Sequence, residues 1–282
     1  RATAKNMQVI GFDFKSEYDF KFAKEFKKIA KDKNADVVFL HSSKAQTLAV
    51  LSSFIYRMKT PLVLCRTLIR RVDTNFLRKW KYNYNGIKKI ICVSHPVVDV
   101  LKYTVKDHRK LCVVGSVTDI NKFPHQEPTG KLRKEYGIDN SLPIIGNIAE
   151  FTGFKDHHTW VKTVAILVKK HQLQAKFILV GKGALEEEIR NLVKELDLED
   201  HIIFAGFRKD IPEILPDFDL FMFTSNNEPT GGVLLESYAC KVPIVAANAG
   251  GIPEVVIDQK TGLLAEVGNP EDFAALSNCS AH

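Results

Sequence analysis

Residues 220–239, LFMFTSNNEPTGGVLLESYA, give the strongest indication of how this chain folds. The stretch begins with four apolar residues typical of a buried strand and ends with an apolar run typical of a helix. Between them, Glu228 and Pro229 precede Gly231 and Gly232, which stand where the helix would begin. Two glycines at a helix start cost up to about 1 kcal/mol each in conformational entropy. They therefore indicate a backbone that comes close to a partner.

The predicted helix start would expose the backbone N–H groups of Gly231, Gly232 and Val233, and such groups form a site for an anion. Glu236, eight positions after Glu228, is placed to accept hydrogen bonds from hydroxyls beside that anion. A ligand that is both a phosphate ester and a polyol, such as a nucleotide-sugar, would satisfy both features. The alternative from these residues alone is a common Glu-Pro turn before a helix with a solvated acidic face.

The sequence that follows, KVPIVAANAGGIPEVV at 241–256, predicts a helix end, a short buried strand and then a loop with Gly250 and Gly251. In open parallel sheets, ligands bind at the carboxyl ends of such strands. The stretch 219–262 resembles the donor-binding half of retaining glycosyltransferases of family four, the glycosyl transferases group 1. The family pattern is Glu-Pro-x-Gly, a second Glu after seven residues, Gly-x-Pro-Val-Val-Ala, and Gly-Gly-x-Pro-Glu-Val-Val. This chain keeps nearly all of it, with Lys241 in place of the usual Gly.

The resemblance implies an α/β protein of the GT-B fold, with two Rossmann-like lobes facing an interdomain cleft. It also implies transfer of a sugar, with retention, from a nucleoside-diphosphate sugar (UDP or GDP) to a hydroxyl of a glycan or lipid-linked saccharide. Glu236 would hold the ribose hydroxyls and Glu228 the sugar hydroxyls, while Lys155 and the amides of 231–233 would stabilise the departing diphosphate. No side chain is identified as a nucleophile, because the family is thought to react on one face of the sugar, with the leaving phosphate helping to deprotonate the acceptor.

Further donor residues follow from the same resemblance. Lys155 matches a family lysine after the first strand of the second lobe, but Glu150 stands where the family usually has Arg. Gly181, in a Gly-x-Gly after a predicted strand, corresponds to a loop near the nucleotide; a tight strand–helix turn is the alternative. Arg208 corresponds to the loop that lines the base pocket.

In the front half, His41 ends a strand that resembles the family's strand with His at the cleft. It is therefore a candidate to contact the transferred sugar or the acceptor, and a satisfied core or surface histidine is the alternative. Arg66, Arg70 and Arg71 cluster after a predicted strand at 61–65. We expect them to grip an anionic group of the acceptor, unless they form a solvated loop.

The composition indicates a globular chain without a membrane span. Its 282 residues suffice for two domains, with 45% hydrophobic and 26% charged residues, and no run of 18 apolar residues occurs. The five cysteines lie far apart, which favours a reducing, cytoplasmic setting. Asp217 and Asp219 are spaced like a metal pair, but the family has a surface turn there. We therefore expect neither a metal nor another cofactor.

The charge is unevenly distributed, with a net +15 over residues 1–140 and −8 over the remainder. A basic front half predicts an anionic partner. No nucleic-acid recognition motif occurs, so an anionic membrane at the inner face or a phosphorylated lipid carrier is favoured. The predicted helix at 19–31 has apolar residues on one face and lysines mostly on the other. That pattern fits an interfacial helix or an ordinary helix packed on a core.

The order of elements predicts two domains. Strands at 7–12, 36–40, 61–65, 89–93 and 111–114 alternate with helices, which indicates a parallel sheet. The alternation resumes in the second half, with strands predicted at 144–148, 176–180, 202–204, 220–223 and 244–246. We assign 1–125 to an incomplete acceptor-side domain, 126–142 to a linker with a short helix at 131–136, and 143–282 to the donor domain. Because the family's first glycine-rich loop and last helices are not found, we interpret the chain as truncated at both ends. An inactive nucleotide-binding remnant and a nucleotide-sugar epimerase are the alternative functions.

Overall fold

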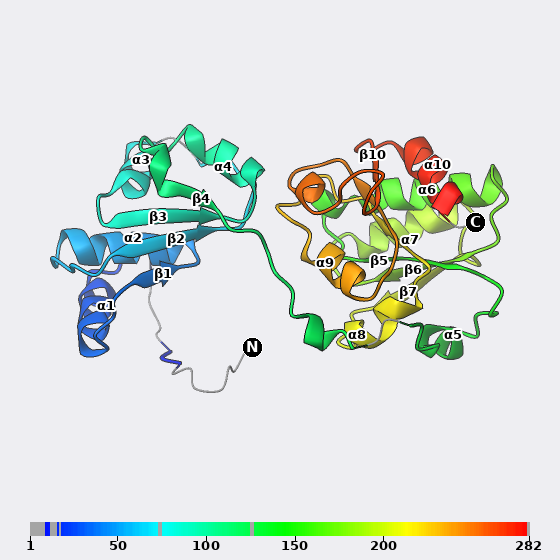
Figure 1. Cartoon of the computed structure of the whole chain (residues 1–282), viewed down its shortest axis with the longest axis horizontal. Coiled ribbons are helices and arrows are strands. Elements are labelled where there is room, and N and C mark those ends of the chain that lie inside the picture. The colour runs from blue at the N-terminus through cyan, green and yellow to red at the C-terminus, as the bar shows by residue number, and fades with distance from the viewer. Residues whose placement is uncertain (1–8, 12–15, 17, 73–74, 125–126, 281–282) are drawn as a thin grey trace. The chain divides into compact units, whose positions relative to one another are not determined.

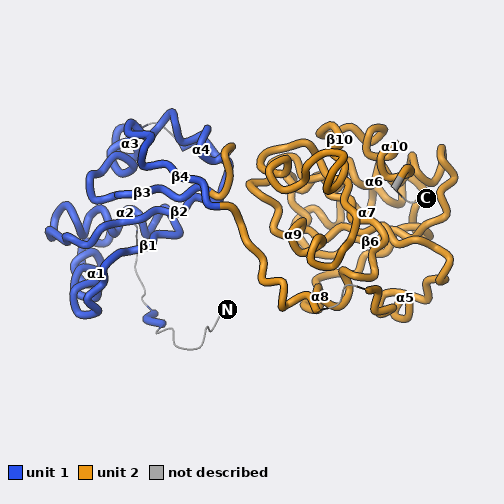
Figure 2. Tube along the Cα trace, viewed as in Figure 1, with its two compact units in different colours: residues 1–92, 97–114 blue, residues 93–96, 115–282 orange. Residues whose placement is uncertain are grey.

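The chain forms two compact α/β units in the computed structural model, which describes residues 9–11, 16, 18–72, 75–124 and 127–280 (Figures 1 and 2). The first unit comprises residues 1–92 and 97–114, and the second comprises residues 93–96 and 115–282. Each unit is built on a parallel sheet. The predicted class, two Rossmann-like lobes, is confirmed. The predicted domain boundaries and the cleft stay predictions.

The first unit contains a four-stranded sheet in the order β1-β2-β3-β4, and every pair is parallel. Its strands are β1 (Val38–Leu40), β2 (Leu62–Arg66), β3 (Ile87–Cys92) and β4 (Leu111–Val113). The helices are α1 (Phe20–Asp32), α2 (Ser43–Phe54), α3 (Phe76–Asn83) and α4 (His95–Lys102). The strand predicted at 7–12 is wrong for residues 9–11, which are not in a strand. Residues 7, 8 and 12 lie outside the described part of the chain.

Helix α1 packs its apolar face against α2. This supports the second of the two interpretations of the sequence, an ordinary helix packed on a core. Ala23 and Ala30 are buried, and Ser52 of α2 donates a 2.7 Å hydrogen bond to the Ala23 carbonyl. Asp19 caps the start of the helix, because its carboxylate accepts from the Phe22 N–H at 2.9 Å and so satisfies one of the free donors of the first turn. The lysines on the opposite face, Lys21, Lys24, Lys28 and Lys31, are exposed.

The second unit contains a six-stranded parallel sheet in the order β10-β9-β8-β5-β6-β7. Its strands are β5 (Ile144–Ile148), β6 (Lys176–Val180), β7 (Ile202–Gly206), β8 (Leu220–Phe223), β9 (Ile244–Ala247) and β10 (Leu263–Ala265). Strand order reverses between β5 and β8, and open parallel sheets bind ligands outside the carboxyl ends of their strands at such a point. The loops after β5 and β8 are therefore where a site is expected.

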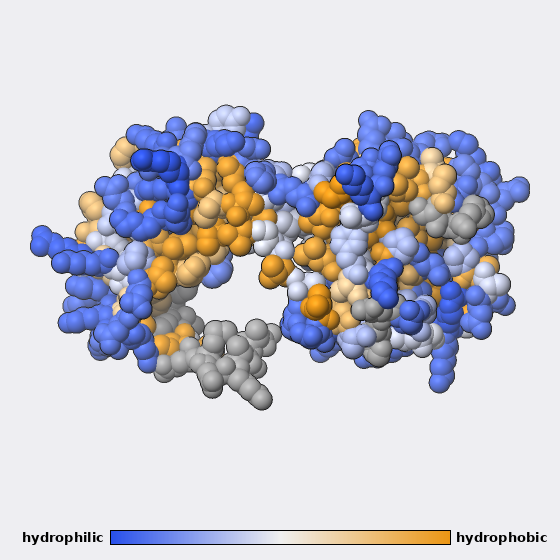
Figure 3. Space-filling view, viewed as in Figure 1, coloured by the Kyte–Doolittle hydropathy of each residue, from blue (hydrophilic) through white to orange (hydrophobic). Residues whose placement is uncertain are grey.

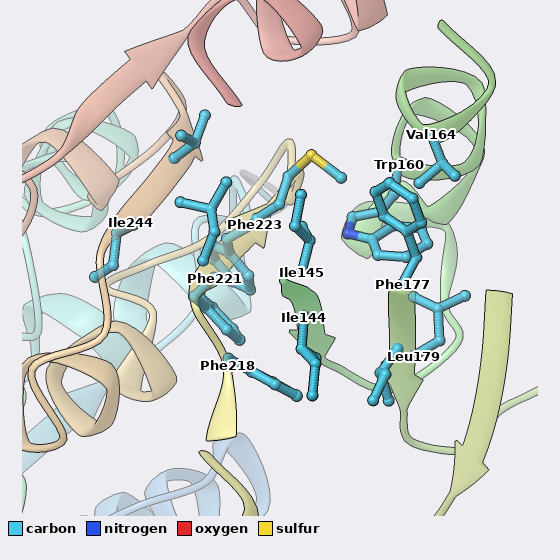
Figure 4. Close-up of a cluster of buried hydrophobic side chains, with 14 of the residues drawn as sticks. Ile144, Ile145, Trp160, Val164, Phe177, Leu179, Phe218, Phe221, Phe223 and Ile244 are labelled. Atoms are coloured by element: carbon cyan, nitrogen blue, oxygen red, sulfur yellow. The ribbon is translucent and has the colours of Figure 1, made fainter. Parts of the chain in front are cut away.

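Helices cover this sheet and close one core with it. They are α5 (Lys131–Tyr136), α6 (His157–Lys169), α7 (Glu186–Glu195), α8 (Ile211–Ile214), α9 (Gly232–Ala239) and α10 (Pro270–Ser280). Trp160 of α6 meets Phe177 of β6 edge to face, with ring centroids 6.2 Å apart, and both are fully buried (Figure 4). Each such side chain contributes roughly 1.5–3 kcal/mol by leaving water. On the face that Figure 3 shows, hydrophilic side chains cover much of each unit, and hydrophobic ones also gather there.

The segment before β5 docks on a buried carboxylate. Asp217, only 2% exposed, accepts hydrogen bonds from the backbone N–H groups of Thr129, Gly130 and Leu132, at 2.6, 2.8 and 2.8 Å. The helix predicted at 131–136 is confirmed as α5. Asp217 was expected in a surface turn. That expectation is wrong, since the carboxylate is enclosed by the chain that it caps.

The C-terminal stretch folds further than the sequence predicted. Strand β10 and helix α10 had no counterpart among the predicted elements. Helix α10 packs against α6, β8, β9 and β10, with Phe273 and Ala274 fully buried. The three-residue β10 and a helix without a regular apolar period explain the omission.

Lys241 follows α9 in the left-handed conformation, with φ 60°. Its N–H donates to the Tyr238 carbonyl at 3.0 Å, and the Val242 N–H donates to the Ser237 carbonyl at 3.0 Å. Glycine is the usual residue at this position of a helix C-terminus, because a Cβ clashes with backbone there. We expect Lys241→Gly to raise the free energy of unfolding by about 1 kcal/mol, measured by urea denaturation. Lys241→Ala keeps the Cβ, so an equal gain in that variant would contradict the explanation.

Candidate functional site

The loop between β8 and α9 holds Glu228, and an ion pair joins this residue to Lys155 in the loop between β5 and α6. Lys155 Nζ contacts Glu228 Oε2, and the side chains are only 17% and 13% exposed. Ser225 Oγ donates to the same carboxylate oxygen at 3.2 Å. The Lys155 ammonium also lies 5.4 Å from the centroid of the Phe223 ring. Two of the three residues predicted to act in catalysis are thus brought together, His41 being the third, and Ser225 was not predicted.

Two hydroxyl side chains also link the two loops. Thr224 Oγ1 lies 2.9 Å from the Asp156 carbonyl oxygen and 3.2 Å from that of Lys155, and its one proton is shared between them. Ser225 Oγ lies 3.0 Å from the Phe154 carbonyl oxygen, which shares the Ser225 proton with Glu228. Both hydroxyl residues are fully buried, so the bonds form away from water. The ion pair is therefore held on a rigid support.

The start of α9 presents free backbone donors. Gly231 has φ 71° and precedes Gly232, the first helical residue. Among the described residues, no protein group accepts from the N–H groups of Gly231, Gly232 and Val233. A Cβ at Gly232 would meet nothing within 4 Å, so the space in front of it is open. Glu236, on the same helix, is half-buried, and that burial raises its pKa while nearby Lys122 lowers it.

The Gly250–Gly251 loop packs against the loop that carries Glu228. The Gly251 N–H donates to the Glu228 carbonyl at 2.8 Å. A Cβ at Gly251 would lie 1.9 Å from the Pro229 carbonyl oxygen, so no other residue fits without moving backbone. The close approach that this glycine permits is to the protein's own chain. Its predicted contact with the donor stays a prediction.

A cavity of about 400 Å³ lies at the ends of β5, β6 and β7. Its lining includes Ala149, Glu150, Gly181, Phe207 and Arg208. Gly181 has φ 146°, and a Cβ there would lie 2.0 Å from the Ala149 carbonyl oxygen. The tight turn between strand and helix thus requires this glycine. Such a turn was the alternative to a role near the nucleotide in the sequence analysis. Glu150 is exposed and lines the cavity in the place of the expected arginine.

Arg208 is held against the cavity wall by two carboxylates. Its guanidinium donates to Glu135 at 2.5 and 3.0 Å and to Asp210 at 2.9 and 2.7 Å. These bonds to Asp210 and then Glu135 raise the pKa of Arg208, and its bonds to Asp210 hold that carboxyl's pKa well below its usual range. The neighbouring Phe207, in the loop predicted to line the base pocket but given no role of its own, is 65% exposed and offers the cavity a ring for stacking.

In the first unit, the structure places the predicted arginine cluster next to His41. Arg66, at the end of β2, donates from Nη2 to the Arg70 carbonyl at 3.3 Å. The Arg71 guanidinium carbon lies 5.3 Å from the centroid of the Tyr103 ring. His41 is exposed, stacks on Phe39 with centroids 6.4 Å apart, and lines a cavity together with Arg66 and Arg70. Nothing in the structure tests the role predicted for His41.

The described part of the chain contains neither a cluster of metal ligands nor a membrane-spanning helix. No three His, Cys, Asp or Glu side chains gather there as ligands for a metal ion. No helix within those same residues has the length and apolar character needed to cross a bilayer. Independence from a metal stays a prediction.

His157 supplies a pH dependence that can be measured. It is 2% exposed and stacks on Phe151 with centroids 4.2 Å apart; burial, then Lys155 and His158, lowers its pKa from 6.5 to about 4. As the pH falls, the imidazole of His157 therefore binds a proton at a higher pH in the unfolded chain than in the folded one. The free energy of unfolding thus decreases as the pH falls from 6.5 towards 4. We expect a loss of about 2 kcal/mol between pH 7 and pH 5 by denaturant unfolding. The His157→Phe variant lacks this group, so its free energy of unfolding should fall by about 2 kcal/mol less than that of the parent over the same pH range. An equal fall in the two proteins would show that His157 does not cause the pH dependence.

Comparison with known proteins places this geometry in context. The family profile described as "Glycosyl transferases group 1" matches residues 128–278. The N-acetyl-alpha-D-glucosaminyl L-malate synthase of Bacillus anthracis is 31% identical over 91% of this chain and 68% of its own length. An N-acetylgalactosamine-N,N'-diacetylbacillosaminyl-diphospho-undecaprenol 4-alpha-N-acetylgalactosaminyltransferase of Campylobacter jejuni is 23% identical over 88% and 67%.

A solved structure gives the same fold. Anabaena HepE in complex with UDP and glucose superposes with a TM-score of 0.75 at 25% identity. The match covers 92% of this chain and 71% of that one. The chain thus spans about two thirds to three quarters of the length of the proteins compared.

Proposed function

The chain belongs to the glycosyl transferases group 1 family, and from this premise we propose that it transfers a sugar from a nucleoside diphosphate, with retention, to a hydroxyl acceptor. One observation carries the proposal. The free N–H groups at the start of α9 and the Lys155–Glu228 pair both lie in loops at the carboxyl edge of one sheet. They flank the point where strand order reverses, which suits a charged ligand.

The donor chemistry follows from charge. A nucleoside diphosphate leaves with developing negative charge, which backbone N–H groups at a helix start and a nearby ammonium stabilise. Gly231–Val233 and Lys155 supply these groups, while Glu228 binds the sugar hydroxyls and Glu236 the ribose. HepE was solved with UDP and glucose, so UDP is the first nucleotide to test. The leaving phosphate would help to deprotonate the acceptor on the same face of the sugar.

The nucleotide base fits the cavity beside Phe207. An exposed aromatic ring at the edge of a cavity stacks on a base. Arg208, already paired with Glu135 and Asp210, would line the base pocket and position the adjoining loop. Gly181, Gly250 and Gly251 would shape the donor site by allowing close backbone packing.

The acceptor is proposed to be a glycan or lipid-linked saccharide, bound by the first unit through His41, Arg66, Arg70 and Arg71. The Campylobacter jejuni relative is named for a diphospho-undecaprenol acceptor. The exposed lysines of α1 would add contact with an anionic bilayer, at the inner face of the membrane of a cytoplasmic enzyme.

A direct test combines binding and product analysis. Thermal shift against UDP-, GDP-, ADP- and TDP-sugars identifies the donor, and NMR of the product gives its anomeric configuration. Retention of the donor configuration supports the proposal, and inversion contradicts the mechanism. Binding of UDP without hydrolysis or transfer would identify the chain as an inactive remnant, and interconversion of the donor sugar without acceptor would identify an epimerase.

A further inference from the structure

The first unit contains two adjoining cavities with a cationic lining. One, of about 250 Å³, is lined among others by Arg66, Arg70, Arg71, Arg78 and Lys81. The second, of about 350 Å³, shares Arg66 and Arg70 with it. None of the described residues that line either cavity is Asp or Glu. The described part of this lining is therefore rich in cationic side chains.

Gln46 is a second and independent sign of a ligand. It lines the larger cavity and is 0% exposed, yet within the described residues neither its Nε2 nor its Oε1 has a hydrogen-bond partner. Arg66 lines both cavities. Its Nε is buried and likewise has no hydrogen-bond partner among the described residues. A buried polar group left without a partner costs about 1–3 kcal/mol. Such a group is explained when a ligand completes its hydrogen bonds.

Helix α2 adds to the positive potential. Ser42 caps the helix by accepting from the Ala45 N–H at 3.1 Å, and Ser43, its first residue, lines both cavities. The start of a helix carries a partial positive charge and attracts anions. On the other side, Lys81 is 6% exposed and its ammonium donates to Thr47 Oγ1 of α2 at 2.7 Å. The cation is thereby fixed beside the first turns of that helix.

We propose that this site binds a phosphoryl group; we call it the arginine pocket and define it by Gln46, Arg66, Arg70, Arg71, Arg78 and Lys81. Guanidinium forks match the geometry of phosphate oxygens. Near neutral pH, a phosphate monoester or a diphosphate carries roughly two negative charges and accepts several hydrogen bonds at once. The Gln46 amide would donate to one such oxygen. Resting on the proposed function, the phosphoryl group belongs to the acceptor, either a sugar phosphate or the diphosphate of a lipid carrier.

The test titrates inorganic phosphate into the full chain in the presence of saturating UDP, so that the donor site is occupied, and measures the dissociation constant by calorimetry. Arg66→Gln should weaken phosphate binding at least tenfold and leave the affinity for UDP unchanged. Lys79→Gln is the matched control. It removes one charge from the exposed surface of α3, the helix that carries Arg78 and Lys81. Lys79 is not among the residues that line the cavities, so this variant should bind phosphate like the parent.

Gln46→Leu separates a ligand-binding role from a structural one. Because it removes unpaired polar atoms from a buried site, we expect a higher melting temperature without phosphate and at least tenfold weaker phosphate binding. If Gln46→Leu instead melts lower and binds phosphate normally, the residue is structural and the proposal fails. Absence of phosphate binding to the parent, or equal binding to Arg66→Gln, also overturns it.

Competition identifies the source of the phosphoryl group. Glucose 1-phosphate and farnesyl diphosphate represent a sugar phosphate and a lipid diphosphate, and malate represents a dicarboxylate. Displacement by either phosphorylated probe supports the proposal, and stronger displacement by malate overturns it. The two inferences fail separately. If the parent does not bind UDP, the proposed function is refuted. If it binds UDP but transfers sugar equally well to phosphorylated and uncharged acceptors, only the phosphoryl-binding role of the arginine pocket is refuted.

Discussion

Replacement of Lys155 by Met is expected to slow sugar transfer by about 10²–10³-fold, because an ammonium aimed at a departing diphosphate stabilises charge that develops only in the transition state. The same change should destabilise the protein. Glu228 is 13% exposed and pairs with Lys155, so removal of the cation leaves a carboxylate largely out of water. Breaking such a pair costs about 3 kcal/mol. The checks are turnover with the best donor and denaturant unfolding.

A double variant separates the two effects. Lys155→Met combined with Glu228→Gln removes both charges and keeps the approximate volumes, and Ser225 still has an amide to contact in place of the carboxylate. We expect stability to return to within about 1 kcal/mol of the parent, since replacing a whole buried pair is often close to neutral. Transfer should stay slow. If the double variant recovers turnover together with stability, the pair is structural and its catalytic role is refuted.

The elements that position the site could be predicted because their sequences are locally decisive. Strands β5, β6 and β8 have the bounds that the apolar runs predicted, and the Glu-Pro and Gly-Gly signals located the loop before α9. Strand β10 could not be predicted in the same way, because three residues, two of them only partly buried, give no period to detect. Sequence periodicity thus predicted the framework of the second unit better than its last elements.

The contacts between loops could not be predicted, because they join residues far apart in the chain. Lys155 and Glu228 are 73 positions apart, and each was assigned its own role without their pairing being foreseen. In the first unit, Arg66, Arg70 and Arg71 were singled out, whereas Arg78 and Lys81 were missed. Both of these lie on α3, where cations usually mark a solvated face. Only the fold of the unit brings them to the same cavity as Arg66.

Loss of the Glu236 carboxylate is expected to weaken nucleotide-sugar binding about 100-fold, because hydrogen bonds to a charged acceptor contribute about 1.5–3 kcal/mol. Glu236→Ala should raise the dissociation constant of UDP-glucose, measured by calorimetry, with little change in turnover at saturation. Glu236→Gln keeps one acceptor oxygen and should lose less. Glu199→Ala, an exposed change in the same unit, should bind like the parent.

The pH dependence of binding distinguishes this role from a packing effect. Burial raises the pKa of Glu236, so the carboxylate gains its proton at a higher pH than an exposed glutamate would. As pH is lowered through that raised pKa, the parent should lose affinity for UDP-glucose, because the protonated group accepts hydrogen bonds poorly. Glu236→Gln has no proton to gain, and its affinity should stay level over the same range. Parallel pH profiles for the two proteins would show that Glu236 does not bind the ribose through its charge.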